Sequence, residues 1–225
     1  MRGHSAKVVF AAPNWLGDAV MSLPALGLLA AADVRVSVMV RPYPARVFRG
    51  VTGVDEIVVP AQGGRISRTI AAARALDAIG TDAVVLAPPS FSSAVAPWLA
   101  RVPVRVGYAA DARNALLTEA AIEPMRGTEH LSDSYLRLAR RALAGLGIPV
   151  PDAAPLPPLC VFEEDRDEVT ALRSRIGIGS TYAVVIAGAT YGPAKSWPVS
   201  RFRDMVRVLS EDVPVLVAGG GAERD

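Results

Sequence analysis

The sequence has few of the residues that cross-link secreted proteins or bind metals: its 225 residues include one cysteine and two histidines. A single thiol, Cys160, cannot form a disulfide within the chain, which favours a reducing compartment. An excess of one charge is also missing, because 24 basic and 22 acidic side chains leave a formal net charge of +2. Nucleic-acid-binding proteins usually carry a marked basic excess, so we expect no nucleic-acid partner.

Long apolar runs are missing as well. The longest, residues 19–32, contains Ser22 and Pro24 and is shorter than the ~20 residues that a membrane span needs. The apolar run before Pro13 has only about five residues, too few for the hydrophobic region of a secretory signal. We therefore expect a cytoplasmic protein, for which peripheral attachment to a membrane through an exposed face stays open.

Two common nucleotide-binding motifs are absent. A Walker A loop requires glycine directly before its lysine, whereas Ala194 precedes Lys195. The G-x-G-x-x-G fingerprint follows none of the expected strands, and the first strand-end loop contains only Gly17. A P-loop enzyme and a nicotinamide or flavin enzyme are therefore not expected.

Apolar strands alternate with helices along the whole chain, which predicts an α/β fold with doubly wound parallel sheets. We expect strands at residues 7–12, 34–40, 55–59, 82–87, 104–108, 183–187 and 213–218. We expect helices at residues 17–32, 42–49, 65–79, 91–100, 129–146, 163–175 and 199–209.

Five prolines between residues 149 and 158 indicate an extended connector between two domains. We therefore expect a first domain at residues 1–148, a linker at 149–162 and a second domain at 163–225. Two strands with their helices cannot cover both faces of a sheet, so the second domain is expected to be incomplete, either because the chain is truncated or because another polypeptide completes it.

The loop at residues 13–18, PNWLGD, lies between the first expected strand and helix. Ligands of open α/β sheets bind in the crevice at the carboxyl ends of the strands, so Asp18 is placed to face a substrate. The alternative is that Asp18 only caps the helix or complements its dipole.

The matching loop of the second domain is GATYGPAKSWP at residues 188–198. Its glycines allow close approach of a ligand, the following helix offers free N–H groups, and Lys195 adds a positive charge, a combination that suits a phosphate. The alternative is a solvated Lys195 beside an aromatic Trp197 that packs and a proline, Pro198, in the first helical turn.

Four segments together resemble the bacterial heptosyltransferases, glycosyltransferase family 9, and within it the lipopolysaccharide heptosyltransferase II type. They are PNWLGDAVMSLPAL, LAPPSFSSAVAPWLARVPVRVGY, EHLSDSYLRL and GATYGPAKSWP, at residues 13–26, 86–108, 129–138 and 188–198. The resemblance implies a GT-B fold of two Rossmann-like domains, with an acceptor side at residues 1–148 and a nucleotide-sugar side at 163–225. The family pattern continues with a second donor-binding segment beyond residue 225.

The same resemblance implies an inverting transfer of heptose from ADP-heptose to the lipopolysaccharide inner core at the inner membrane, with no cofactor and no metal. Asp18 matches the family's proposed catalytic base. Thr190, Lys195 and Glu223 match residues that bind the donor, the lysine at its phosphates and the glutamate near its nucleoside. The alternatives are a non-catalytic nucleotide-binding fragment and a family 9 transferase that uses another nucleotide sugar.

Arginines around the strand at residues 104–108 are candidates for binding the acceptor. The family's acceptor carries carboxylates and phosphates, which Arg105 and Arg113 could pair through two hydrogen bonds each. The alternative is that both are ordinary solvated arginines.

Overall fold

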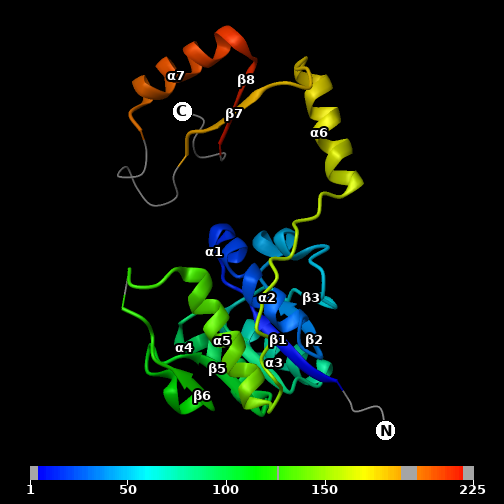
Figure 1. The fold of residues 1–225 in the computed structure, drawn as a ribbon, viewed down its shortest axis with the longest axis vertical. Coiled ribbons are helices and arrows are strands. Elements are labelled where there is room, and N and C mark those ends of the chain that lie inside the picture. The colour runs from blue at the N-terminus through cyan, green and yellow to red at the C-terminus, as the bar shows by residue number, and fades with distance from the viewer. Residues whose placement is uncertain (1–4, 126, 189–196, 220–225) are drawn as a thin grey trace. The chain divides into compact units, whose positions relative to one another are not determined.

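The structure is a computed structural model that describes residues 5–125, 127–188 and 197–219. The chain divides into two compact units, Met1–Cys160 and Val161–Asp225 (Figure 1). Within the described residues, no helix combines the length and the apolar character that crossing a bilayer requires.

The first unit alternates strands and helices, as its sequence predicts. Its strands are β1 (Ala6–Ala11), β2 (Val34–Met39), β3 (Glu56–Val58), β4 (Ala83–Leu86), β5 (Val104–Tyr108) and β6 (Glu119–Ala121). Its α-helices are α1 (Leu16–Met21), α2 (Leu23–Ala30), α3 (Arg65–Ile79), α4 (Phe91–Leu99) and α5 (Leu131–Gly145). Two 3₁₀ helices, η1 (Tyr43–Phe48) and η2 (Arg113–Leu116), complete the unit.

The six strands form one parallel sheet in the order β3-β2-β1-β4-β5-β6. The chain therefore leaves β1 toward one edge of the sheet and leaves β4 toward the other, which is the doubly wound arrangement. Ala11, at the end of β1, pairs with Met39 on one side and Leu86 on the other. The carboxyl ends of β1, β2 and β4 therefore lie together.

Each face of the sheet has its own core, because successive side chains of a strand point to opposite faces. Val8 and Phe10 of β1 belong to a core shared with α2 and α5. Val9, between them, belongs to a second core that includes Leu76 of α3 and Ala94 of α4. The result is a three-layer sandwich with helices on both faces.

The expected helix at residues 17–32 is in fact two helices, α1 and α2, that meet at Ser22. Pro24 has no N–H to donate and lies in the first turn of α2, a position that tolerates it. The fully buried Ser22 hydroxyl donates to the carbonyl of Ala19 at 2.7 Å. This contact satisfies one carbonyl at the end of α1.

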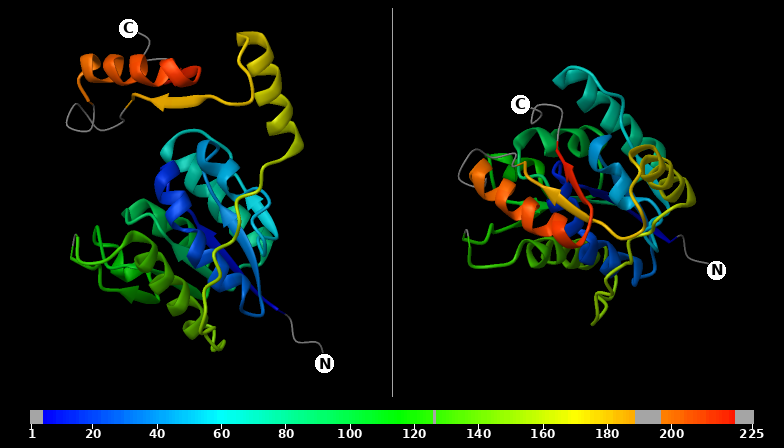
Figure 2. Two further views of the ribbon diagram at one scale, coloured as in Figure 1. Left: turned by 45° about the horizontal axis from the view of Figure 1, so that its top comes forward. Right: turned by 90° about the horizontal axis from the view of Figure 1, so that it is seen from above.

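The proline-rich segment belongs to the first unit and packs on its helix α2. A Cβ added to Gly27 of α2 would lie only 1.7 Å from the Pro155 carbonyl oxygen. Further along, the Cys160 thiol donates to the Gly50 carbonyl at 3.0 Å. Figure 2 follows the segment, drawn in yellow-green, along the outside of α2.

The second unit contains α6 (Glu163–Ile176), β7 (Ala183–Ile186), α7 (Val199–Asp212) and β8 (Val215–Ala218). β7 and β8 pair in parallel. Helix α6 has acidic residues in its first turn and arginines in its last, which complements the helix dipole, and it ends at Gly177 with φ of +69°.

Candidate functional site

The strand order places a crevice at the carboxyl ends of β1 and β4. The chain turns in opposite directions after these two neighbouring strands, so the loops that follow them separate and leave a gap between them. These loops are residues 12–15 and 87–90. They are also the beginnings of two of the segments on which the family resemblance depends.

A cavity of about 210 Å³ occupies this edge of the first unit. Its floor is apolar and includes Leu86 of β4 and Leu76 of α3. Its polar wall combines three arginines, two amides and four hydroxyls. These residues are Asn14, Arg41, Gln62, Arg65, Arg68, Thr69, Ser90, Ser92 and Ser93.

The charge of the cavity is positive. Among the described residues that line it, none is acidic, and Arg41, Arg65 and Arg68 bring three guanidinium groups. Helix α3 begins at Arg65, and its N-cap, Gly64, has no side chain to accept from the N–H groups of the first turn. Free N–H groups and the positive end of the helix dipole add to the attraction for an anion.

Two arginines reach the cavity because α3 presents one face to it. Arg65, Arg68 and Thr69 lie three and four residues apart, followed by Ala72 and Leu76 on the same side. The third, Arg41, comes from the end of β2. Guanidinium groups in this number suit carboxylates and phosphates, which they bind through paired hydrogen bonds.

Asp18 lies in the first turn of α1, four residues after the cavity residue Asn14, and its side chain is partly exposed. The N-cap of α1 is Trp15, whose side chain forms no capping hydrogen bond, and Asp18 is the acidic residue of the first turn. Its charge complements the helix dipole. Asp18 is not among the described residues that line the cavity, and its role as a base stays a prediction.

Tyr135 of α5 lies close enough to Asp18 for the two groups to interact electrostatically. Burial raises the pKa of the Tyr135 phenol, and the negative charge of Asp18 raises it further. The Tyr135 ring packs edge-on against Phe10 of β1, with the ring centres 6.4 Å apart. Tyr135 is therefore a neutral phenol within electrostatic range of the candidate base.

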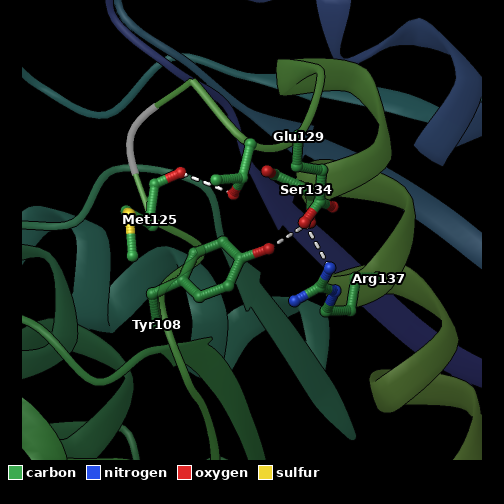
Figure 3. Close-up of polar contacts among 6 residues, drawn as sticks. Tyr108, Met125, Glu129, Ser134 and Arg137 are labelled. Atoms are coloured by element: carbon green, nitrogen blue, oxygen red, sulfur yellow. Dashed lines mark hydrogen bonds and ion pairs between the residues drawn. The ribbon is translucent and has the colours of Figure 1, made fainter.

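The first turn of α5 is fixed to the end of β5 (Figure 3). The Tyr108 hydroxyl donates to the Ser134 carbonyl at 2.8 Å, and Arg137 forms an ion pair with Glu129. Burial raises the pKa of Tyr108, an effect that the positive charge of Arg137 partly offsets. The phenol thus acts as a neutral donor that anchors α5 beside the carboxyl edge.

Both arginines predicted to bind the acceptor donate to backbone carbonyls. Arg105 donates from Nε to Leu116 at 2.7 Å and from Nη1 to Val102 at 2.6 Å. Arg113 is fully buried, and its Nη1 donates to Pro88 at 2.5 Å. Direct contact of either with an acceptor stays a prediction.

The other predicted site residues lie elsewhere in the chain. Thr190, Lys195 and Glu223 fall outside the described residues. Arg41, Arg65, Arg68 and Asn14 of the cavity were not predicted from the sequence. A signal for two of them exists, because Arg65 and Arg68 are one helical turn apart directly after Gly63-Gly64, at a predicted helix start.

The family model for glycosyltransferase family 9 (heptosyltransferase) matches residues 69–225. The chain belongs to glycosyltransferase family 9. Its fold is accordingly of the GT-B type, as the family resemblance implies.

Among curated proteins, lipopolysaccharide heptosyltransferase 2 of Salmonella typhimurium is 25% identical over 97% of this chain. The chain spans 65% of the length of that relative. Among solved structures, the family 9 glycosyltransferase of Veillonella parvula matches all of this chain and 65% of its own, with a TM-score of 0.81 and 22% identity. The ADP-heptose heptosyltransferase II of Escherichia coli matches 96% of this chain and 65% of its own, with a TM-score of 0.76 and 23% identity.

Proposed function

We propose that this family 9 protein transfers heptose from ADP-heptose to the lipopolysaccharide inner core, with inversion at the anomeric carbon. The observation that carries the proposal is the cavity at the carboxyl edge of the first unit, where three arginines meet serine and amide side chains without a carboxylate among the described lining residues. An inner-core acceptor bears carboxylates and phosphates together with sugar hydroxyls. The cavity supplies partners for both kinds of group.

In this proposal residues 1–148 are the acceptor side and residues 163–225 belong to the donor side, joined by residues 149–162. Family membership and the names of the relatives support ADP-heptose as donor. The protein works in the cytoplasm, at the face of the inner membrane where its lipid-anchored acceptor lies.

Asp18 acts as the catalytic base. It takes the proton of the acceptor hydroxyl while that oxygen attacks the anomeric carbon from the face opposite the departing ADP. The O–H bond breaks, the new glycosidic C–O bond forms, and the bond between the anomeric carbon and the diphosphate breaks with its electron pair going to ADP. Asp18 is partly exposed and lies in the first turn of α1, directly after the strand-end loop that brings Asn14 to the cavity, which supports this role.

Lys195 offsets the negative charge that builds on the departing diphosphate, and Thr190 and Glu223 bind the phosphates and the nucleoside. Positive charge at a leaving group stabilises the transition state more than the ground state, which is the requirement for catalysis. These three roles rest on the family resemblance.

The test is a transfer assay with the complete polypeptide. ADP-heptose and a truncated lipopolysaccharide core are incubated with the protein, and mass spectrometry follows the addition of one heptose while NMR reads the anomeric configuration of the product. We expect one heptose, added with inversion. Addition only from another nucleotide sugar would instead support the second candidate, a family 9 transferase with a different donor, and retention of configuration would contradict the mechanism.

A non-catalytic nucleotide-binding fragment is the remaining alternative, since the chain spans only 65% of its curated relative. Titration of ADP into the 225-residue chain, together with the same assay, separates the two. Binding of ADP without transfer by either the chain or the complete polypeptide would favour the non-catalytic function.

A further inference from the structure

The turn between β5 and η2 has an unusual backbone. Two consecutive residues other than glycine, Asp111 and Ala112, have positive φ of 52° and 56°. L-residues rarely adopt this conformation, which persists only where the surrounding contacts hold it. The contacts that hold this turn in its strained conformation therefore indicate its structural role.

Residues on both sides of Ala112 contact the loop that follows β4. The Asp111 carboxylate accepts the backbone N–H of Phe91 at 2.6 Å, at the start of α4. Arg113 Nη1 donates to the Pro88 carbonyl at 2.5 Å and to the Ser93 hydroxyl at 2.8 Å. The loop is thus held at both of its ends.

Arg113 is itself held by the end of β5. Its Nε donates to the Tyr108 carbonyl, at the end of β5, at 2.9 Å. Gly107 leaves the space that the guanidinium occupies, because a Cβ there would lie 2.9 Å from Nη2 and 3.3 Å from Cζ. A side chain at position 107 would therefore displace the guanidinium group.

Burying the Arg113 guanidinium lowers the stability of the fold unless its contacts compensate. Arg113 is fully buried, and burial lowers the pKa of its guanidinium, which the charges of Glu123 and Asp111 offset in part. Its Nη2 is buried and has no hydrogen-bond partner among the described residues. No carboxylate in the described part of the chain forms an ion pair with Arg113. A buried cation with an unpaired N–H group usually needs a reason beyond packing.

The loop that Arg113 holds forms a wall of the cavity. Pro88, Ser90, Ser92 and Ser93 all line it. The Ser90 and Ser92 hydroxyls lie 3.2 Å apart, and the Ser93 hydroxyl lies 2.6 Å from the Ser90 carbonyl, to which it can donate. Arg113 binds Ser93 and Pro88, so it fixes this serine wall without lining the cavity itself.

We propose that Arg113 and Asp111 are positioning residues for the acceptor: they hold the Pro88 to Ser93 wall in the shape that presents the Ser90 and Ser92 hydroxyls to the acceptor sugar. This proposal rests on the proposed function of the cavity as the acceptor site. Gly107 leaves the space that the guanidinium needs, and Arg113 bridges β5 and the loop. The serines of the loop contact the substrate.

Two variants test the positioning role. Arg113→Lys keeps the charge but has no planar fork to bridge Tyr108, Pro88 and Ser93. Gly107→Ala keeps Arg113 and pushes its guanidinium away, so it remains informative if Arg113→Lys fails to fold. Lys7→Ala is the matched control, because Lys7 Nζ also donates to a carbonyl, that of Ile79 at 2.7 Å, at the amino end of the sheet.

The measurements are the Kd of a delipidated truncated lipopolysaccharide core, the Kd of ADP, and amide hydrogen exchange in residues 86–96, all on the complete polypeptide. We expect Gly107→Ala and Arg113→Lys to speed exchange in this segment and to raise the Kd of the core roughly tenfold, the factor for one lost hydrogen bond. The Kd of ADP stays at its wild-type value, and Lys7→Ala leaves all three measurements unchanged. A general loss of structure would instead weaken ADP binding as well.

Arg68→Ala separates the two levels of the proposal. If it weakens core binding while Gly107→Ala and Arg113→Lys do not, the positioning role is wrong and the acceptor cavity stands. If it leaves the Kd of the core unchanged, the cavity is not the acceptor site, and the positioning role falls with it even where loop exchange responds. Unchanged exchange in residues 86–96 in both Gly107→Ala and Arg113→Lys would also overturn the positioning role.

Discussion

Gly27→Ala tests whether the proline-rich segment is part of the first unit's folded structure. Gly27 lies in the interior of α2, where alanine should favour the helix by about 1 kcal/mol. A Cβ at this position would lie 1.7 Å from the Pro155 carbonyl oxygen and 2.9 Å from its carbon. Both are backbone atoms, so no side-chain rotation can relieve the clash.

The magnitude follows from these distances. An ordinary contact between carbon and oxygen is about 3.3 Å, so the carbonyl must retreat by roughly 1.5 Å. The segment would then lose part of its packing, in which Pro157 is buried and Val150 and Ala154 lie against the core. Overpacking of this kind costs about 1–3 kcal/mol. A clash this severe with backbone atoms belongs at the upper end, which leaves a net destabilisation of about 2 kcal/mol after the helical gain.

Two measurements are made. Urea unfolding gives the free energy of unfolding, and hydrogen exchange under native conditions is followed in peptides from α2 and from residues 149–160. Gly17→Ala in α1 is the matched control, since a Cβ there has no atom within 4 Å among the described residues. We expect Gly17→Ala to stabilise slightly, and Gly27→Ala to destabilise and to speed exchange in residues 149–160. A Gly27→Ala protein as stable as the wild type would refute the packing of this segment on α2.

Three further predictions concern the site. Asp18→Asn should lower transfer by roughly 10²- to 10⁴-fold, the usual contribution of a general base, while ADP binding stays near wild type; substantial turnover in a transfer assay would exclude Asp18 as the base. Lys195→Ala should weaken donor binding measured by calorimetry, and an unchanged donor Kd would count against its phosphate role. Tyr135→Phe should raise the pH at which the protein unfolds in base: the folded-state pKa of Tyr135 lies above its ordinary value of 10.0, so its stabilising contribution is complete below pH 10 and is lost as the pH rises further. Circular dichroism against pH checks this with Tyr43→Phe, an exposed tyrosine, as control; an identical shift in both variants would contradict it.

Much of the fold could be predicted from the sequence because the local spacing of apolar residues indicates where helices and strands form. The expected helix at residues 65–79 and strand at 104–108 have the observed bounds. The three-residue strand β6 was missed, since Glu119–Ala121 is too short for alternation to be recognised. The expected helix at residues 17–32 is divided at Ser22, which the sequence marks only by the nearby Pro24, because the burial of Ser22 depends on the surrounding helices.

The candidate site was less predictable, since it depends on strand order. Arg41 and Arg65 are far apart in the sequence and meet at one cavity because β2 and β4 flank β1. No local sequence pattern predicts this order of strands. Arg113 shows the same limit, since a lone arginine in a polar loop is usually solvated, whereas here it is fully buried beneath a cavity wall.

The most direct test of the account is to locate where the acceptor binds. A delipidated truncated lipopolysaccharide core is added to the complete polypeptide, and hydrogen exchange is compared with and without it. We expect protection in three segments that line the cavity: the loop after β1, the first turns of α3 from Arg65, and residues 88–93. Protection confined to other parts of the chain, with these three segments unchanged at saturating core, would contradict the claim that this cavity is the acceptor site.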